Sequence, residues 1–413
     1  MNRTGKRLTA LAAVPLLLAA FAACGSSDDS SGGKAGEKVE ITFQEQFSDA
    51  ETAQFEKQLA SFSQANPNIT VKLVRDNDKS YYDKLTTQIA GGKGPDVVRV
   101  EPPRATQFIA SGWALPLDDT VQAKEYFPAS LEPITKDGKL YGVPADLSAL
   151  ALFYRTDLLS AAGISTPPAT WDEFTTAAKK LTNGKVKGAG LFGGWGGFEF
   201  YPWLWQSGAD VLDKDQKTAV FNSPEAVKAL QLWVDLQKDA MPAGMASATE
   251  DDLKGPFVSG TLGMMTSGPW MIPSLKTAGI DGKWAVAPLP KDQQEATVLG
   301  GLDLLVLKNS KHADAAKTFV KWLMDDAVQK EWASALGYIP VKTALYDDPV
   351  FKDDKYVSAF SAVLQQARSR PSVPQAGDID TALGNAVQAA LSGKKSPKDA
   401  LDEAVEASNK ALQ

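Results

Sequence analysis

The sequence of 413 residues has a single cysteine, Cys24, and a single histidine, His312. One cysteine excludes an internal disulfide and any zinc or iron–sulfur site that needs several thiolates. One histidine argues against a histidine metal cluster and against a Ser–His–Asp triad. The glycine run at residues 91–94 lacks the spacing and the Ser or Thr of a phosphate-binding loop. We therefore expect no metal ion and no cofactor.

Basic residues are fewer than acidic ones: the chain has 43 Lys and Arg and 50 Asp and Glu, which gives a formal net charge of −7. Nucleic acids are not expected as partners, since phosphate binding needs a basic surface. Hydrophobic residues make up 44% of the chain and charged residues 23%. This balance is typical of a globular protein with a sizeable core, and the length predicts two or three domains at about 100–200 residues each.

The apolar stretch near the start is shorter than the roughly 20 residues that a transmembrane helix takes. It follows three basic residues, which is the pattern of a signal peptide over residues 1–23. The residues before Cys24 resemble the lipobox of bacterial lipoproteins, with Phe21 where Leu is usual. This resemblance implies a lipid anchor on the Cys24 thiol; the alternative is an ordinary buried or free cysteine. The polar residues 24–37 predict a flexible linker.

The patterns that follow predict an α/β fold. Residues 39–43, 69–74 and 96–100 have the period of strands, and residues 55–62 and 82–90 have the period of helices. Alternating strands and helices predict parallel strands joined by helical crossovers.

A second α/β series begins with the apolar run at residues 149–154. Thr170 and Glu173 have the spacing of a capping box, which predicts the start of a helix, and Ser223-Pro224 predicts another. Later strands are expected at residues 258–265, 284–287 and 303–306, and later helices at residues 315–324, 327–336 and after Ser396.

Several short motifs, in order along the chain, resemble one protein family. They are the GPDVV stretch at residues 94–98, GKLYGVP at 138–144, PATWDE at 168–173, GPW at 268–270 and GYIPV at 337–341. From about Val39 to its end, the chain is similar to the extracellular solute-binding proteins of sugar ABC importers, the class of maltodextrin-binding protein.

This resemblance implies two α/β lobes joined by hinge segments, with the ligand in the cleft between them. The N-terminal lobe would comprise residues 38–147 and 302–336, and the C-terminal lobe residues 148–301 and 337–413. The chain would cross between the lobes near residues 146–148, 298–301 and 336–341.

A sugar offers apolar faces on which aromatic rings stack, and a rim of hydroxyls that planar polar side chains bind. Residues 193–205 hold six aromatic side chains after a pair of glycines, more than core packing needs. The resemblance places Phe198 and Trp270 at stacking positions. To these we add Trp195, Glu199 and Tyr201, whereas the remaining aromatics of the segment, Phe200, Trp203 and Trp205, are expected in the core.

Polar ligand contacts are expected from several parts of the chain. Gln44 and Glu45 end the first strand, and Glu101 and Arg104 follow the third, where open α/β sheets bind ligands. Arg104 also matches a family arginine. By the resemblance, Asp146, Gly300 and Asp303 would face the cleft at the crossings, and Arg370 would reach it. For each single charged residue of this set, a solvated surface position is about as common.

Together these observations favour a monomeric, lipid-anchored protein that binds a di- or oligosaccharide outside the cytoplasm and delivers it to a membrane permease. Ligands of the maltose and maltodextrin type lead; other glycans and glycerol-phosphate esters are the alternatives. A second hypothesis is a secreted glycoside hydrolase or lyase, in which Glu199 would act with Glu45 or Asp303. A third is a structural or adhesive lipoprotein without a small ligand.

Overall fold

The computed structural model of the protein describes residues 38–77 and 80–413. The predicted signal peptide (residues 1–23), the lipidation site Cys24 and the linker (residues 24–37) lie outside the described residues. Within the described part, no helix has both the length and the apolar character that crossing a membrane requires.

A mixed six-stranded sheet contains the first series of strands. It has the order β12-β11-β3-β1-β2, and β6 also pairs with β11. β1 is parallel to β2 and β3, as predicted, whereas β11 is antiparallel to β3 and β6. Its strands are β1 (Val39–Glu45), β2 (Ile69–Arg75), β3 (Val97–Val100), β6 (Val143–Ala149), β11 (Thr297–Val306) and β12 (Ala367–Arg368).

A four-stranded sheet contains the second series, in the order β10-β7-β9-β8. β8 and β9 are parallel, whereas β7 is antiparallel to both of its neighbours. These strands are β7 (Ala151–Arg155), β8 (Lys187–Gly190), β9 (Leu262–Ser267) and β10 (Trp284–Ala287), and a separate hairpin joins β4 (Thr135–Lys136) to β5 (Lys139–Leu140).

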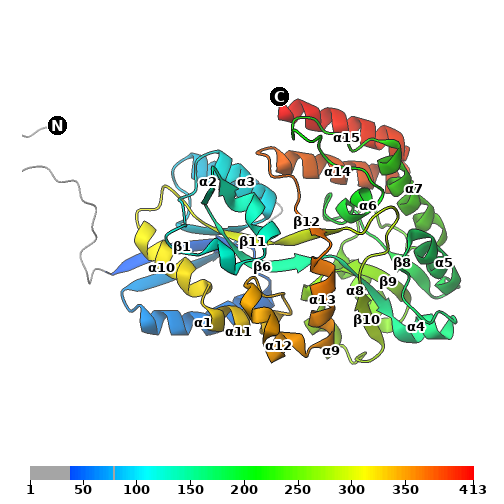
Figure 1. Ribbon diagram of the computed structural model, residues 1–413, viewed down its shortest axis with the longest axis horizontal. Coiled ribbons are helices and arrows are strands. Elements are labelled where there is room, and N and C mark those ends of the chain that lie inside the picture. The colour runs from blue at the N-terminus through cyan, green and yellow to red at the C-terminus, as the bar shows by residue number, and fades with distance from the viewer. Residues whose placement is uncertain (1–37, 78–79) are drawn as a thin grey trace, which may run out of the picture. The chain divides into compact units, whose positions relative to one another are not determined.

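Two paired strands join the sheets. β6 ends at Ala149, and after one residue the chain continues into β7 of the second sheet. β11 comes after β10 of the second sheet and then runs along β6 and β3 of the first. Figure 1 shows β6 and β11 in the middle, with β1 on one side and the second sheet's β8, β9 and β10 on the other. A third segment joins them at Ile339, whose N–H donates to the Leu147 carbonyl at 3.3 Å. The lobe boundaries at 147/148, 301/302 and 336/337 stay a prediction, because residues 38–413 form one contact unit.

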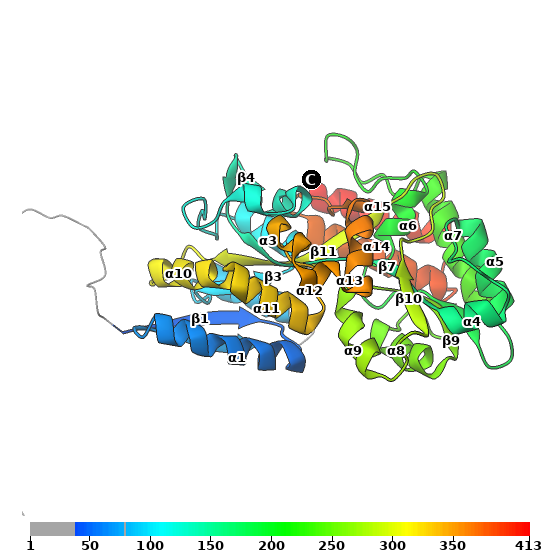
Figure 2. The same cartoon turned by 60° about the horizontal axis from the view of Figure 1, so that its bottom comes forward.

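Helices cover both sheets, and Figure 2 shows α13 and α14 near the joining strands. Those before β9 are α1 (Asp49–Ala65), α2 (Tyr81–Ala90), α3 (Pro102–Ala110), α4 (Thr156–Ala161), α5 (Trp171–Leu181), α6 (Tyr201–Gln206), α7 (Pro224–Asp239) and α8 (Glu250–Ser259). Those after it are α9 (Ile272–Thr277), α10 (Ala313–Leu323), α11 (Asp326–Leu336), α12 (Pro349–Lys352), α13 (Lys355–Leu364), α14 (Ala376–Leu391) and α15 (Pro397–Leu412). Short 3-10 turns are η1 (Ala123–Glu125), η2 (Pro128–Ile134), η3 (Pro269–Met271) and η4 (Thr343–Asp347).

Local chemistry explains several helix starts. Ser48 caps α1 by accepting a hydrogen bond from the Glu51 N–H, and the Glu51 carboxylate accepts from the Ser48 N–H. Thr170 caps α5 by accepting from the Glu173 N–H, but the Glu173 carboxylate bonds the Ala169 N–H. The predicted capping box is therefore only half formed there.

One predicted strand starts too early. Residues 258–259 belong to α8, and β9 begins only at Leu262. Leu253 and Phe257 are both buried on one face of α8, so the helical pattern continues beyond the position where the apolar run suggested a strand. Gly260 then ends the helix with a left-handed backbone conformation, φ +77°.

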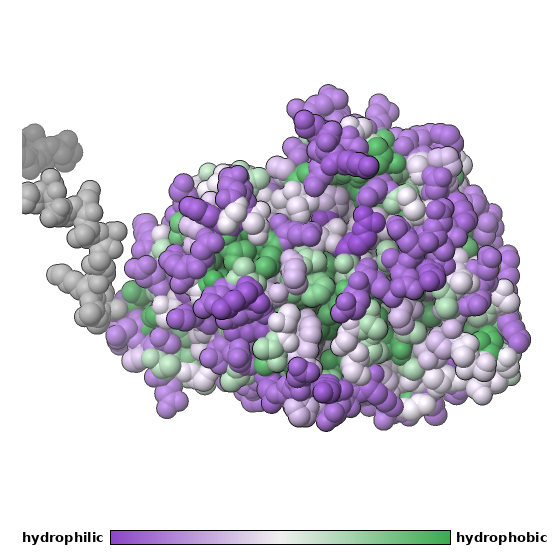
Figure 3. All heavy atoms as spheres, in the orientation of Figure 1, coloured by the Kyte–Doolittle hydropathy of each residue, from purple (hydrophilic) through white to green (hydrophobic). Residues whose placement is uncertain are grey.

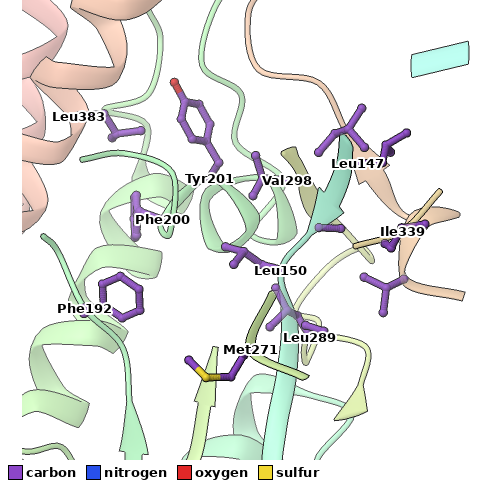
Figure 4. Packing of buried hydrophobic residues seen from close by; sticks show 14 of the residues in the cluster. Leu147, Leu150, Phe192, Phe200, Tyr201, Met271, Leu289, Val298, Ile339 and Leu383 are labelled. Atoms are coloured by element: carbon purple, nitrogen blue, oxygen red, sulfur yellow. The ribbon is translucent and has the colours of Figure 1, made fainter. Parts of the chain in front are cut away.

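The core is rich in aromatic side chains on both sides of the joining strands. Phe43, Phe55 and Phe319 lie with ring centroids 5.4–6.2 Å apart under the first sheet. Under the second, Phe200 and Trp203 pack edge-on against Trp233, and Figure 4 shows Phe200 close to other buried residues. Phe200, Trp203 and Trp205 are at most 1% exposed, which confirms their assignment to the core.

Gly301 is the tightest point of the strand pair. Its φ is +121°, and a Cβ there would lie 2.2 Å from the Asp146 carbonyl oxygen. We expect Gly301→Ala to lower the free energy of unfolding by about 3 kcal/mol, since both the backbone angle and the contact oppose a side chain. Chemical denaturation measures this. Gly184→Ala is the control, because a Cβ at Gly184 meets nothing within 4 Å; equal stability of both variants would contradict the argument.

Candidate functional site

A pocket of about 510 Å³ lies beside the joining strands. Its walls come from all three joining segments, from residues that follow β3 and β12 of the first sheet, and from segments that follow β8 and β9 of the second. The residues that line it are Glu101, Asp146, Ser148, Trp195, Phe198, Trp270, Gly300, Gly301, Leu302, Tyr338 and Arg370. Seven of these were predicted from the sequence as ligand-binding residues, and they are Glu101, Asp146, Trp195, Phe198, Trp270, Gly300 and Arg370.

Aromatic rings form one side of the pocket. Trp195 and Trp270 lie with ring centroids 6.0 Å apart and planes inclined by 52°, and Trp195 is 37% exposed. Phe198 reaches the joining strand β11, where a Cβ on Gly300 would lie 2.9 Å from its ring. The absence of a side chain at Gly300 therefore makes room for the Phe198 ring. Flat rings placed in this way offer apolar stacking surfaces at a solvent-accessible position.

Asp146 lies on the polar side of the pocket, and an ion pair with the buried Arg99 holds it in place. The buried Arg99 guanidinium forms an ion pair with Asp146 and a second one with Glu51, at 3.0 Å. Although burial lowers the pKa of an arginine, these two carboxylates outweigh it and raise the pKa of Arg99, which therefore stays charged. Tyr338, which lines the pocket, donates its hydroxyl to Glu51 at 3.1 Å. Both pocket residues are thus tied to one buried cation.

Arg370 connects the aromatic and polar sides. Its guanidinium lies 5.3 Å from the centre of the Phe198 ring, a cation–π distance. It also lies 3.5 Å from a Glu101 oxygen and 3.6 Å from an Asp380 oxygen. Burial raises the pKa of Asp380 to about 6, although Arg370 opposes the shift. Asp380 packs against the aromatic segment, because Cβ atoms on Gly196 and Gly197 would lie 3.1 Å from its carboxyl oxygens.

Three predicted residues of the first sheet and its helices do not line the pocket. Gln44 and Glu45 are at most 5% exposed, and burial raises the pKa of Glu45 to about 8 although Arg99 opposes it. Arg104 points along α3 instead, where it donates to Gln107 at 3.0 Å and lies 5.2 Å from the Tyr82 ring centre.

Three predicted residues of the second series and of β11 are also outside the pocket lining. Glu199 is 1% exposed and accepts a hydrogen bond from the Thr266 hydroxyl at 2.5 Å; burial raises its pKa to about 8. Tyr201 is fully buried beside Trp205, and Figure 4 shows it among core residues. Asp303 borders a separate cavity of only about 10 Å³. The carboxylates considered for glycoside hydrolysis, Glu199 with Glu45 or Asp303, therefore do not face the pocket.

Four lining residues were missed by the sequence analysis as ligand contacts, namely Ser148, Gly301, Leu302 and Tyr338. Ser148, Gly301 and Tyr338 lie within the segments where the chain was expected to cross between lobes. Position at a crossing was therefore the available signal. In the part of the chain that the structure describes, no group of three or more His, Cys, Asp or Glu residues is arranged to hold a metal ion.

The chain is similar in sequence to known solute-binding proteins. A family model described as bacterial extracellular solute-binding protein matches residues 57–359. The maltodextrin-binding protein MdxE of Bacillus subtilis is 26% identical over 426 residues, covering 97% of this chain and 96% of that protein.

Solved structures of sugar-binding proteins are also similar to this chain. Maltose-bound MalE3 of T. maritima has a TM-score of 0.82 and 30% identity, covering 90% of this chain and 98% of that one. The GacH receptor of Streptomyces glaucescens, solved unliganded and with acarbose, has a TM-score of 0.83 and 28% identity, covering 91% and 98%. These similarities confirm the predicted α/β, two-lobed binding-protein fold. The chain belongs to the family of bacterial extracellular solute-binding proteins.

Proposed function

We propose that this protein is an extracytoplasmic binding lipoprotein that captures a di- or oligosaccharide and delivers it to an ABC transporter permease, without making or breaking a bond. Maltose and maltodextrin-type α-glucosides are the favoured ligands. The observation that carries the proposal is the pocket itself, which is lined by the rings of Trp195, Phe198 and Trp270 together with the carboxylates of Glu101 and Asp146. A sugar needs this combination of stacking surfaces and planar hydrogen-bonding groups.

The chemistry of the relatives supports the choice of sugar. One similar structure holds maltose, another was solved with acarbose, and the related Bacillus subtilis protein is named for maltodextrin. Glycerol-phosphate esters fit the pocket less well, because Glu101 and Asp146 line it with negative charge and Arg370 is the one cation among its lining residues. An uncharged ligand avoids this repulsion.

Binding would use closure of the two proposed lobes. The sugar would first stack on the aromatic side and then donate hydrogen bonds from its hydroxyls to the carboxylates as the polar side approaches, a hinge motion about the joining strands. The ligand stabilises the closed state only through contacts that it makes there and not in the open state. The permease would then recognise surfaces of both lobes at the rims of the pocket.

A glycoside hydrolase is the rival function, and maltotriose distinguishes the two. We expect incubation with maltotriose to raise the melting temperature without releasing glucose or maltose. Product formation, followed by chromatography, would support the enzyme. No shift with maltotriose or with a panel of other glycans would contradict sugar binding.

Trp270 tests the aromatic side of the pocket. We expect Trp270→Ala to weaken maltodextrin binding about 10- to 100-fold, because a large stacking surface is lost, with little change in melting temperature. Isothermal titration calorimetry measures the affinity. Trp113→Ala is the control, since Trp113 is partly buried and packs on Phe108 away from the pocket. Unchanged affinity in Trp270→Ala would remove this residue from the site.

Cys24 tests the anchor. The lipobox resemblance implies lipidation, and a diacyl group would hold the protein on the membrane at about 0.8 kcal/mol per buried methylene. We expect Cys24→Ala to lose palmitate labelling and to leave the membrane fraction, whereas Ser26→Ala, in the same linker, should keep both. A Cys24→Ala protein that stays in the membrane fraction would show that the lipid is not attached there.

A further inference from the structure

The orientation of Trp270 depends on an unusually close packing with its own backbone. Trp270 lies in η3, directly after β9, and its ring folds back over Gly268. A Cβ on Gly268 would lie only 2.0 Å from a ring carbon, so the ring occupies the space of the missing side chain. This contact holds the indole close to the backbone. Apolar contact has no preferred direction, so the rotation of the ring is fixed only if a directional hydrogen bond is also present.

Glu250 supplies that directional bond. One of its carboxylate oxygens accepts a hydrogen bond from the Trp270 indole N–H at 2.7 Å, and the other accepts from the Ser267 hydroxyl. Glu250 is 4% exposed and Ser267 is fully buried. A single carboxylate at the start of α8 therefore joins the end of β9 to the indole. Burial raises the pKa of Glu250 to about 7, although the two hydrogen bonds oppose the shift.

The indole that Glu250 holds is one of the three rings on the aromatic side of the pocket. Trp195 lies beside it at a centroid distance of 6.0 Å and packs edge-on against Phe192, at 5.1 Å, on its other side. In the described part of the chain, Trp195 and Val350 are the large hydrophobic side chains that are exposed. On the face that Figure 3 shows, hydrophilic residues predominate. Two neighbouring tryptophans at a solvent-accessible pocket, Trp195 exposed and Trp270 half-buried, need support from behind to keep one geometry.

We propose that Glu250 is a positioning residue for the ligand site, which fixes the Trp270 ring in its stacking orientation before the ligand arrives. This inference rests on the proposed sugar-binding function. Binding to a ring that is already immobilised avoids the entropic cost of ordering it, about 0.5–1.5 kcal/mol per side chain, or roughly two- to tenfold in affinity. The carboxylate touches the tryptophan and not the pocket, since Glu250 is not among the lining residues.

A double-mutant cycle tests the proposal. Glu250→Met should weaken maltotriose binding by roughly tenfold in calorimetry, and Glu250→Gln, which keeps an oxygen for the indole N–H, should restore most of the affinity. Trp270→Phe keeps a ring but removes the N–H, so Glu250→Met should change the affinity less than twofold in that background. Asp251→Met is the control for lost acidic charge in the same helical turn, because Asp251 is exposed, and it should bind like the wild type.

An equal loss from Glu250→Met in both backgrounds would show that Glu250 acts through the fold and not through the indole, and would overturn the proposal. So would a Glu250→Met protein with unchanged affinity.

A second measurement needs no sugar and therefore separates this proposal from the proposed function. In the free protein with ¹⁵N-labelled tryptophan, the Trp270 indole N–H signal is identified by its loss in Trp270→Phe. It should exchange slowly with solvent in the wild type and in Asp251→Met, and faster in Glu250→Met. Failure of every sugar to bind, with this result intact, would reject the sugar and keep the positioning role. Slow exchange in Glu250→Met would reject the positioning role alone.

Discussion

The antiparallel pairing of β6 with β11 is the constraint on which the pocket depends. These strands carry Asp146 and Ser148 on one side of the pair, and Gly300, Gly301 and Leu302 on the other. A side chain at Gly301 would oppose this pairing, since a Cβ there would lie 2.2 Å from the Asp146 carbonyl oxygen. The register shifts between Leu302 and Asp303, and such an irregularity bends a strand and changes the direction of its side chains. The strands that join the two sheets are therefore also the floor of the site.

The two sides of the pocket are held in place by different physical means. On the aromatic side, rings pack against backbone at glycines, as Phe198 does at Gly300 and Trp270 at Gly268. On the polar side, Asp146 and Tyr338 are held by charged groups that are buried behind them, around Arg99. Close packing tolerates little movement and suits a flat stacking surface. An ionic network keeps hydrogen-bonding groups oriented.

The sequence allowed the fold and seven of the eleven pocket-lining residues to be predicted, and particular residues show why. Period and caps indicated most elements, but residues 258–259 combined an apolar run with the end of a helix, and the pattern alone does not separate these. Glu45 was placed at a strand end correctly, yet strand position does not show whether a side chain turns toward the pocket or into the core. Tyr338 lies in a segment expected to cross between lobes, but its hydrogen bond to Glu51, 287 residues away, is a contact that no local pattern encodes.

Burial also decides which acidic groups near the pocket carry charge. Glu45 and Glu199, with pKa values raised to about 8 by desolvation, hold a proton at neutral pH and act there as neutral groups. Glu51 differs from them, because Arg99 and its hydrogen bonds outweigh burial, lower its pKa and keep it charged. The surroundings of the pocket thus combine paired charges with neutral acids. Such surroundings give little attraction to an anion, whereas a neutral ligand with many hydroxyls can use both the rings and the oriented oxygens.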